Sequence, residues 1–168
     1  MAPVFTVPTI GGPDGPTGPV GPASPAQSYG GIAIRGFFTS GNPSQALATG
    51  SFQKVVNFSA NMPSSGVTPQ FALSQLTIDT SGDYLVFAGI SYVYGPLGNM
   101  RMALFVNGAV RIEVIAGAKT FSFLPSHCDS QNVMSLVAGD VLDMRVLPSA
   151  AATLLVDNAQ LYVERANP

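Results

Sequence analysis

From Gly31 to the C terminus, apolar and polar residues alternate with a period of two, and turn-forming residues separate the alternating stretches. This pattern is typical of strands that bury one face, and no segment shows the spacing of an amphipathic helix. The predicted strands are Ile32–Thr39, Phe52–Phe58, Phe71–Asp79, Tyr84–Tyr94, Met100–Val106, Val110–Ala116, Thr120–Pro125, Asn132–Val137, Val141–Leu147 and Thr153–Arg165. So many short strands predict an all-β sandwich or jelly roll.

Turn signals lie between the predicted strands, at Ser81–Asp83, Gly95–Gly98, Asn107–Gly108 and Ala138–Asp140. The Asn107–Gly108 pair is the strongest of these, because a two-residue hairpin turn favours positive φ at both central positions. We therefore expect a tight hairpin there.

The predicted strand Tyr84–Tyr94 is apolar on both faces, whereas a sandwich strand normally buries one. The tyrosine-rich face needs a second cover, and in a chain this poor in charge an identical subunit is the best candidate. We therefore expect Tyr84, Tyr92 and Tyr94 to form the interface of a homotrimer. If the two faces are exchanged, the face that carries Phe87 is the interface instead.

The N-terminal region has a different pattern, with a glycine at every third position and a proline after each glycine. These glycines are Gly12, Gly15, Gly18 and Gly21. Only glycine fits at the axis of three wound polyproline-type chains, so residues 12–23 are interpreted as a short collagen-like stalk. The alternative is a flexible Pro/Gly-rich linker. Residues 24–30 then form a hinge, and residues 31–168 form the head.

Residues 1–11, upstream of the stalk, are interpreted as an anchor peptide. The stretch Ala2–Ile10 is uncharged, and its larger apolar side chains are those of Val4, Phe5, Val7 and Ile10. Such side chains at the end of a stalk favour docking on a partner surface. The alternative is a frayed terminus.

Charge is scarce: 7 Lys and Arg and 9 Asp and Glu occur among 168 residues, which leaves a net charge of −2. Scattered cations do not form the basic stripe that binds phosphates, so a nucleic-acid partner is not expected. The apolar runs are too short to span a bilayer as helices, so membrane insertion is not expected. The first residues lack a standard secretory signal, which favours assembly in a host cytoplasm.

The residues with catalytic potential are few. His127 is the single histidine and Cys128 the single cysteine, and neighbours on a strand point to opposite faces. Two such groups fall short of the four ligands of a structural zinc site. We therefore expect no enzyme activity, no metal site within one chain and no cofactor. Three copies of His127 and Cys128 around a trimer axis remain a way to bind an ion.

Several motifs together resemble one known superfamily. A Gly-Pro-x stalk is followed by GDYLV from Gly82, LFVNG from Leu104, LVAGDVLDMRV from Leu136 and AQLYVER from Ala159. This arrangement resembles the collagen-tailed, trimeric jelly-roll heads of the complement and tumour-necrosis-factor-like superfamily, including its bacteriophage and spore-surface versions. The cysteines and the aromatic-rich closing motif of vertebrate heads are missing, so receptor or immune functions are not transferred.

The resemblance implies a structural virion protein, a trimeric capsid head fibre or decoration protein at the virion surface. The expected partner of residues 2–10 is then a capsid or portal/tail protein of the virion. Its head would also be able to bind the host surface. The alternative is a tail-tip, cell-surface or spore-surface adhesin that binds glycans or surface protein. Candidate ligand loops at the end away from the stalk are Asn42–Ala48, Asn61–Thr68 and Pro148–Ala152.

Overall fold

The computed structural model describes residues 27–35, 44–94, 99–114 and 126–166. The predicted anchor, the stalk and the predicted strand Thr120–Pro125 lie outside these residues. The described chain consists of β-strands and one 3-10 turn, η1 (Phe71–Leu73). The strands are β1 (Tyr29–Arg35), β2 (Ser44–Leu47), β3 (Gln53–Lys54), β4 (Ala60–Asn61), β5 (Val67–Gln70), β6 (Gln75–Ile78), β7 (Gly82–Tyr94), β8 (Met100–Val106), β9 (Ala109–Val114), β10 (Ser126–Leu136), β11 (Val141–Pro148) and β12 (Ala152–Arg165).

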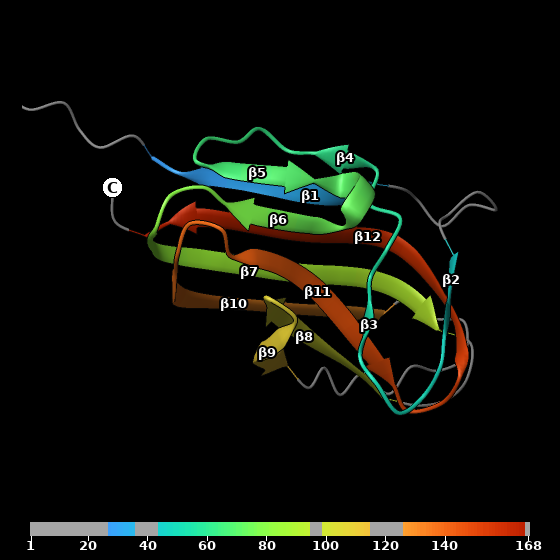
Figure 1. The fold of residues 1–168 in the computed structure, drawn as a ribbon. Helices are drawn as coiled ribbons and strands as arrows, with labels where there is room; N and C mark the ends of the chain where they lie inside the picture. Colours follow the sequence, from blue (N-terminus) through green and yellow to red (C-terminus); the bar gives the residue numbers. More distant parts are fainter. Residues whose placement is uncertain (1–26, 36–43, 95–98, 115–125, 167–168) are drawn as a thin grey trace, which may run out of the picture.

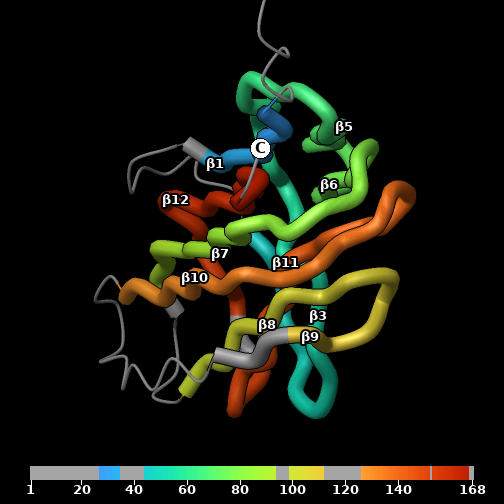
Figure 2. Tube along the Cα trace, turned by 90° about the vertical axis from the view of Figure 1, so that its left-hand side faces the viewer, coloured from blue at the N-terminus to red at the C-terminus, as the bar shows by residue number. Residues whose placement is uncertain are grey.

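The strands form two antiparallel sheets packed face to face, so the predicted all-β jelly-roll sandwich is confirmed (Figure 1). Sheet A has the order β10-β7-β12-β1-β4, and β2 also pairs with β12. Sheet B has the order β5-β6-β11-β8-β9, and β3 also pairs with β11. Figure 2 shows the two layers from the side on which the chain ends. Most neighbours within a sheet are distant in sequence, as expected when the chain crosses repeatedly between two layers.

The first and last strands lie side by side in sheet A. Tyr29 pairs with Glu164, Glu164 pairs with Leu85, and Leu85 pairs with Val133, so these four residues form one row across four strands. We call this row the terminal end of sheet A, because the described chain begins and finishes there. The opposite end, where β7 meets Leu154, is called the far end.

The core lies between the sheets and is built from alternate residues of the strands. On β12, the inward residues Ala159, Leu161 and Val163 are fully buried, and the residues between them are half-buried or exposed. The matching inward residues of β7 and sheet B are also buried: Val86, Ala88, Ile90, Leu76, Ile78, Met102, Leu142, Met144 and Val146. This continuous apolar layer is the main stabilising feature of the sandwich.

The hairpin predicted at Asn107–Gly108 is present between β8 and β9, with φ of 52° and 77° at these residues. Asn107 also ties the hairpin to the next turn. Its side-chain amide donates to Asp140 Oδ1 at 2.7 Å, and its own oxygen accepts from the Val141 amide at 2.9 Å.

The short strands β2, β4 and β5 were not predicted, and β2 lies within the predicted ligand loop Asn42–Ala48. Four element boundaries differ from the sequence prediction by more than two residues. Phe71–Leu73 forms a 3-10 turn instead of a strand start, and Ser74 closes it with φ of 53°. The predicted strand Phe52–Phe58 is reduced to Gln53–Lys54. β10 begins at Ser126, well before the predicted Asn132, and β1 begins at Tyr29, inside the predicted hinge. In the last two cases, pairing with a neighbouring strand satisfies backbone groups that local sequence left unassigned.

Candidate interaction surface

The outer face of sheet A is the main candidate surface, and it is not the face that the sequence predicted. Tyr84 and Tyr92 are fully buried in the core of the single chain, so their assignment to a subunit interface is wrong. Tyr84 donates its hydroxyl hydrogen to the Thr80 carbonyl oxygen at 2.6 Å. Tyr94 belongs to β7, but its side chain lies outside the described part of the structure.

The inward direction of the tyrosines has a physical reason. Their face of β7 is apolar throughout, whereas the opposite face contains Gly89 and Ser91, which would leave a gap and a polar hydroxyl in the core. The clear alternation of apolar and polar residues along β12 is the sequence signal that could have identified the inward face of β7. Because β12 pairs directly with β7, its polar residues mark the outward face of both strands.

Near the terminal end, the outer face of sheet A carries large apolar side chains. Phe87 pairs with Tyr162 across β7 and β12. The Phe87 ring edge lies 3.0 Å from the position that a Cβ on Gly89 would occupy, and Tyr162 lies 3.1 Å from the equivalent position on Gly31. Both rings therefore lie over glycines of their own face, and this arrangement makes the surface smooth.

Further side chains extend this apolar area, which we call the sheet A patch. Leu85 is half-buried beside Phe87, and Val133 on β10 is 56% exposed. Burial and the neighbouring Glu164 raise the pKa of Tyr162 above its ordinary value, so its hydroxyl stays protonated on this surface. The patch consists of Leu85, Phe87, Tyr162 and Val133.

Toward the far end, the same face is polar. Ser91, His127, Asn158 and Gln160 surround a hollow of about 180 Å³ whose floor includes Gly89. His127 Nδ1 lies 2.9 Å from Ser91 Oγ, and His127 Nε2 lies 3.4 Å from Asp129 Oδ1. Sequence reasoning missed this cluster because the polar start of β10 was not predicted to be a strand.

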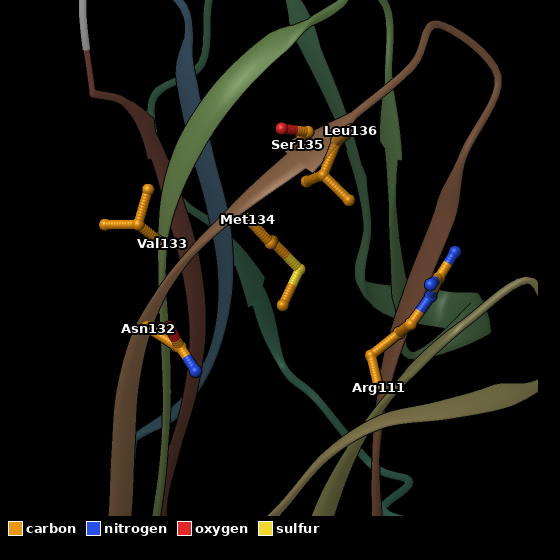
Figure 3. Close-up of a pocket in the computed structure, with 6 residues that line it drawn as sticks. All are labelled: Arg111, Asn132, Val133, Met134, Ser135 and Leu136. Carbon is orange, nitrogen blue, oxygen red and sulfur yellow. The ribbon is translucent and has the colours of Figure 1, made fainter.

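The second candidate surface is the open edge of the sandwich, between β9 at the border of sheet B and β10 at the border of sheet A. A cavity of about 290 Å³ lies there, lined by Arg111, Asn132, Val133, Met134, Ser135 and Leu136. Figure 3 shows that Met134 points into the space on the side of Arg111, while Val133 points away on the other side of β10. Val110 on β9 and Val137, just after β10, are also exposed.

The described part of the chain shows little catalytic potential. Ser91, His127 and Asp129 resemble a Ser-His-Asp arrangement, but both His127 and Asp129 are more than half exposed. Cys128 points into the core, and its burial, with a smaller effect of Asp129, raises its pKa to about 11. Its thiolate is therefore suppressed.

Two acidic residues near the start of β11, Asp140 and Asp143, have structural roles. Asp140 accepts hydrogen bonds from the Val137 amide and the Asn107 side chain, which fits a turn. Asp143 is buried and forms a bidentate pair with Arg145 at 2.6 and 3.0 Å. Among the described residues, no group of three or more His, Cys, Asp or Glu side chains is placed to hold a metal ion, and no helix is long and apolar enough to cross a membrane.

The remaining predicted site residues lie outside the described residues and stay predictions. They are the anchor residues Val4, Phe5, Val7 and Ile10 and the stalk residues Gly12, Gly15, Gly18 and Gly21. One predicted ligand loop, Asn61–Thr68, lies at the terminal end and not away from it. Its Ser65 exchanges backbone hydrogen bonds of 2.8 Å with Tyr29, where the described chain begins.

Comparison with solved structures identifies the fold. Eiger TNF from S. frugiperda is 16% identical, with 84% of this chain and 95% of that chain covered at a TM-score of 0.52. Murine APRIL, in a crystal at pH 5.0, is 13% identical, with coverages of 83% and 99% and a TM-score of 0.56. The fold is a TNF-like jelly roll. No protein-family model and no curated protein matches the sequence.

Proposed function

We propose that this chain is a structural head that assembles as a homotrimer and projects from a virion surface, to which its N-terminal peptide attaches it. The observation that carries the assembly is the sheet A patch, a flat apolar surface that the described part of the chain does not cover. Burying apolar surface of this kind is the main driving force for association.

The head also carries two different apolar surfaces, the sheet A patch and the open edge near Val110 and Val137. When two different surfaces of identical chains meet head to tail, the assembly either closes into a ring or continues as a filament. A closed ring of three agrees with the threefold phase of the Gly-Pro-x segment. It also agrees with the trimeric state that the TNF-like resemblance implies.

The mass of the full chain in solution tests the assembly. We expect about three times 17.3 kDa by sedimentation or light scattering. Phe87→Asp places a charge in the middle of the sheet A patch and should yield monomers with an unchanged circular dichroism spectrum, because burying an unpaired charge is costly. The matched control is Phe71→Asp, an exposed phenylalanine on the β5–β6 connection, which should leave the trimer intact. A monomeric parent chain, or a trimeric Phe87→Asp variant, would contradict the proposal.

The attachment step is tested separately. A shortened chain that begins at Gln27 keeps β1 and its pairing to β12, so it should fold and trimerise. We expect it to fail to attach to virions that the full chain decorates. In the full chain, Phe5→Ser should weaken attachment without changing the melting temperature of the head. If the shortened chain attaches as well as the full chain, the head itself is the attachment module.

The second candidate function is adhesion to a host surface, and one observation favours it. Phe71 and Leu73 are 40% and 58% exposed on η1, which lies at the opposite end of β5 from the terminal end (Figure 1). The turn is held by three contacts: Phe71 donates its amide hydrogen to Asn61 Oδ1 at 3.0 Å, Lys54 Nζ donates to the Leu73 carbonyl at 3.1 Å, and Ser74 donates to the Phe71 carbonyl at 2.9 Å. A rigid turn with apolar side chains loses little entropy on binding. Loss of cell binding in Phe71→Ser, with attachment to virions retained, would support this function.

A further inference from the structure

The first strand of the described chain, β1, is held by neighbours along both of its sides. On one side it pairs with β12 over all seven of its residues, from Tyr29 opposite Glu164 to Arg35 opposite Asn158. On the other side, residues 59–65 bond to every second residue of β1. These backbone contacts are Tyr29 with Ser65 at 2.8 Å in both directions, the Met62 amide to the Gly31 carbonyl at 2.8 Å, and the Ser59 amide to the Ala33 carbonyl at 3.0 Å.

The residues just before β1 are fixed to the head as well. Gln27 donates a side-chain hydrogen bond to Glu164, and the Arg165 amide donates to the Ser28 carbonyl at 2.8 Å. Ser28 is buried against Gly66, which has a φ of 63° and where a Cβ would overlap Ser28 Oγ. Glycine suits this position because it adopts positive φ and adds no side chain. The predicted hinge therefore does not extend into Gln27 and Ser28.

Two core side chains fix the register of β1. Ile32 and Ile34 are 0% and 1% exposed. If β1 slid along its axis by one residue, both side chains would turn to the outer face of sheet A, and a shift of two residues would pull them out of the spaces that they fill. Movement of β1 along its own axis therefore breaks core contacts together with hydrogen bonds.

The direction of β1 decides how the head resists a pull on its N-terminal region. β1 begins at the terminal end and runs toward the far end, antiparallel to β12 (Figure 1). When the head is held at the far end, a pull on the N terminus acts along β1 and stresses its hydrogen bonds together, because they lie perpendicular to the strands. β12 finishes at the terminal end, so a pull between the two chain ends opens the β1–β12 pairs one after another.

We propose that β1, with Gln27 and Ser28, is a mechanical clamp that keeps the head folded when its N-terminal region and its far end are pulled apart. The inference rests on the proposed N-terminal attachment, because such a pull arises when an attached head binds a host surface with the end away from the stalk. The clamp lies within one chain and does not require the proposed trimer.

Single-molecule pulling of the full chain in two directions tests the clamp. One handle is attached at the N terminus, and the second is attached either at Thr153, an exposed β12 residue at the far end, or at the C-terminal Pro168. Thr153→Cys and Pro168→Cys in a Cys128→Ala background give each chain a single thiol. We expect a higher rupture force with the Thr153 handle, because forced unfolding is governed by the unfolding rate, and that rate is lower when the bonds must break together.

A pair of glycine variants tests the contribution of Ser28. Gly66→Ala displaces Ser28 and should lower the rupture force measured with the Thr153 handle. Gly139→Ala is the matched control, because Gly139 also has a positive φ, of 94°, but a Cβ there would meet no other atom within 4 Å. It should leave the rupture force unchanged.

The proposal is overturned if the two handle positions give equal rupture forces, a comparison that changes no residue of β1. It is also overturned if Gly66→Ala ruptures at the same force as Gly139→Ala, because Ser28 would then take no part in the clamp. A chain that shows the expected difference between handles but does not attach to virions would contradict the proposed function and leave the clamp in place.

Discussion

The outer faces of the two sheets differ in how far the chain itself covers them. On sheet B, the chain covers its own surface: Phe52, just before β3, packs edge-on against Phe105 with ring centroids 5.6 Å apart, and Arg145 lies 4.0 Å above the Phe105 ring while it pairs with Asp143. Phe105 and Asp143 are consequently buried. On sheet A, Phe87 and Tyr162 lie flat on the surface without such a cover from the described chain. The difference indicates that a single chain covers the outer face of sheet B, whereas the outer face of sheet A is available to another molecule.

The largest expected effect compares the phenylalanines on the two outer faces. Phe105→Ala should destabilise the fold by about 3–5 kcal/mol, because a buried ring is removed and a cavity remains. Phe87→Ala should change the stability of the monomer by less than about 1 kcal/mol. Both values are measured by urea unfolding at protein concentrations low enough to separate the copies. Equal losses of stability in the two variants would mean that a single chain also covers the outer face of sheet A.

The second effect concerns the ion pair that covers sheet B. Asp143→Asn removes the charge that faces Arg145 Nε at 2.6 Å and Lys54 Nζ at 3.6 Å. We expect a loss of about 1–3 kcal/mol in the free energy of unfolding, because charged donors lose their acceptor in a buried position. The same change at exposed Asp83 should stay within about 0.5 kcal/mol. If Asp143→Asn leaves the free energy of unfolding unchanged, the ion pair does not stabilise the fold through its charge.

A smaller effect tests the flatness of the sheet A patch. A Cβ at Gly89 would lie 3.0 Å from the Phe87 ring edge, so Gly89→Ala should lift the ring from the surface. The ring is the far end of a mobile side chain, and we expect a change in monomer stability below about 1 kcal/mol. Association should weaken measurably in sedimentation equilibrium. Unchanged association would place the contact between copies elsewhere.

The smallest effect checks which side of β10 faces the core. Cys128 should react slowly with iodoacetamide at pH 8, because burial raises its pKa to about 11 and little thiolate is present. Urea should restore the ordinary rate. The ordinary pKa of the thiol is 9.0, and only the folded state raises it. The thiol therefore contributes to pH dependence only above pH 9, and the free energy of unfolding should fall between pH 9 and about 11. Fast labelling of the folded chain would reverse the assignment of His127 and Asp129 to the outer face.

Much of the fold could be predicted from local pattern. Two local signals were sufficient to predict the sandwich: the alternation of apolar and polar residues in β8, β11 and β12, and the Asn107–Gly108 turn. Both are local because burial with a period of two and positive φ depend on neighbours along the chain. The start of β10 was missed, since a polar edge strand has no hydrophobic period. The candidate site was missed for the same reason: Ser91 and His127 are 36 positions apart, and only strand pairing brings them together.

The sequence by itself determined the fold class, the scarcity of charge and the absence of a convincing catalytic pattern, because these depend on composition and on neighbours along the chain. Only the tertiary structure decided which face of β7 is the core. Both faces of that strand carry large apolar side chains, so its own periodicity does not settle the direction, and the choice depends on the packing of a second sheet against it. The buried Tyr84 and Tyr92 and the outward-facing, half-buried Phe87 follow from that packing.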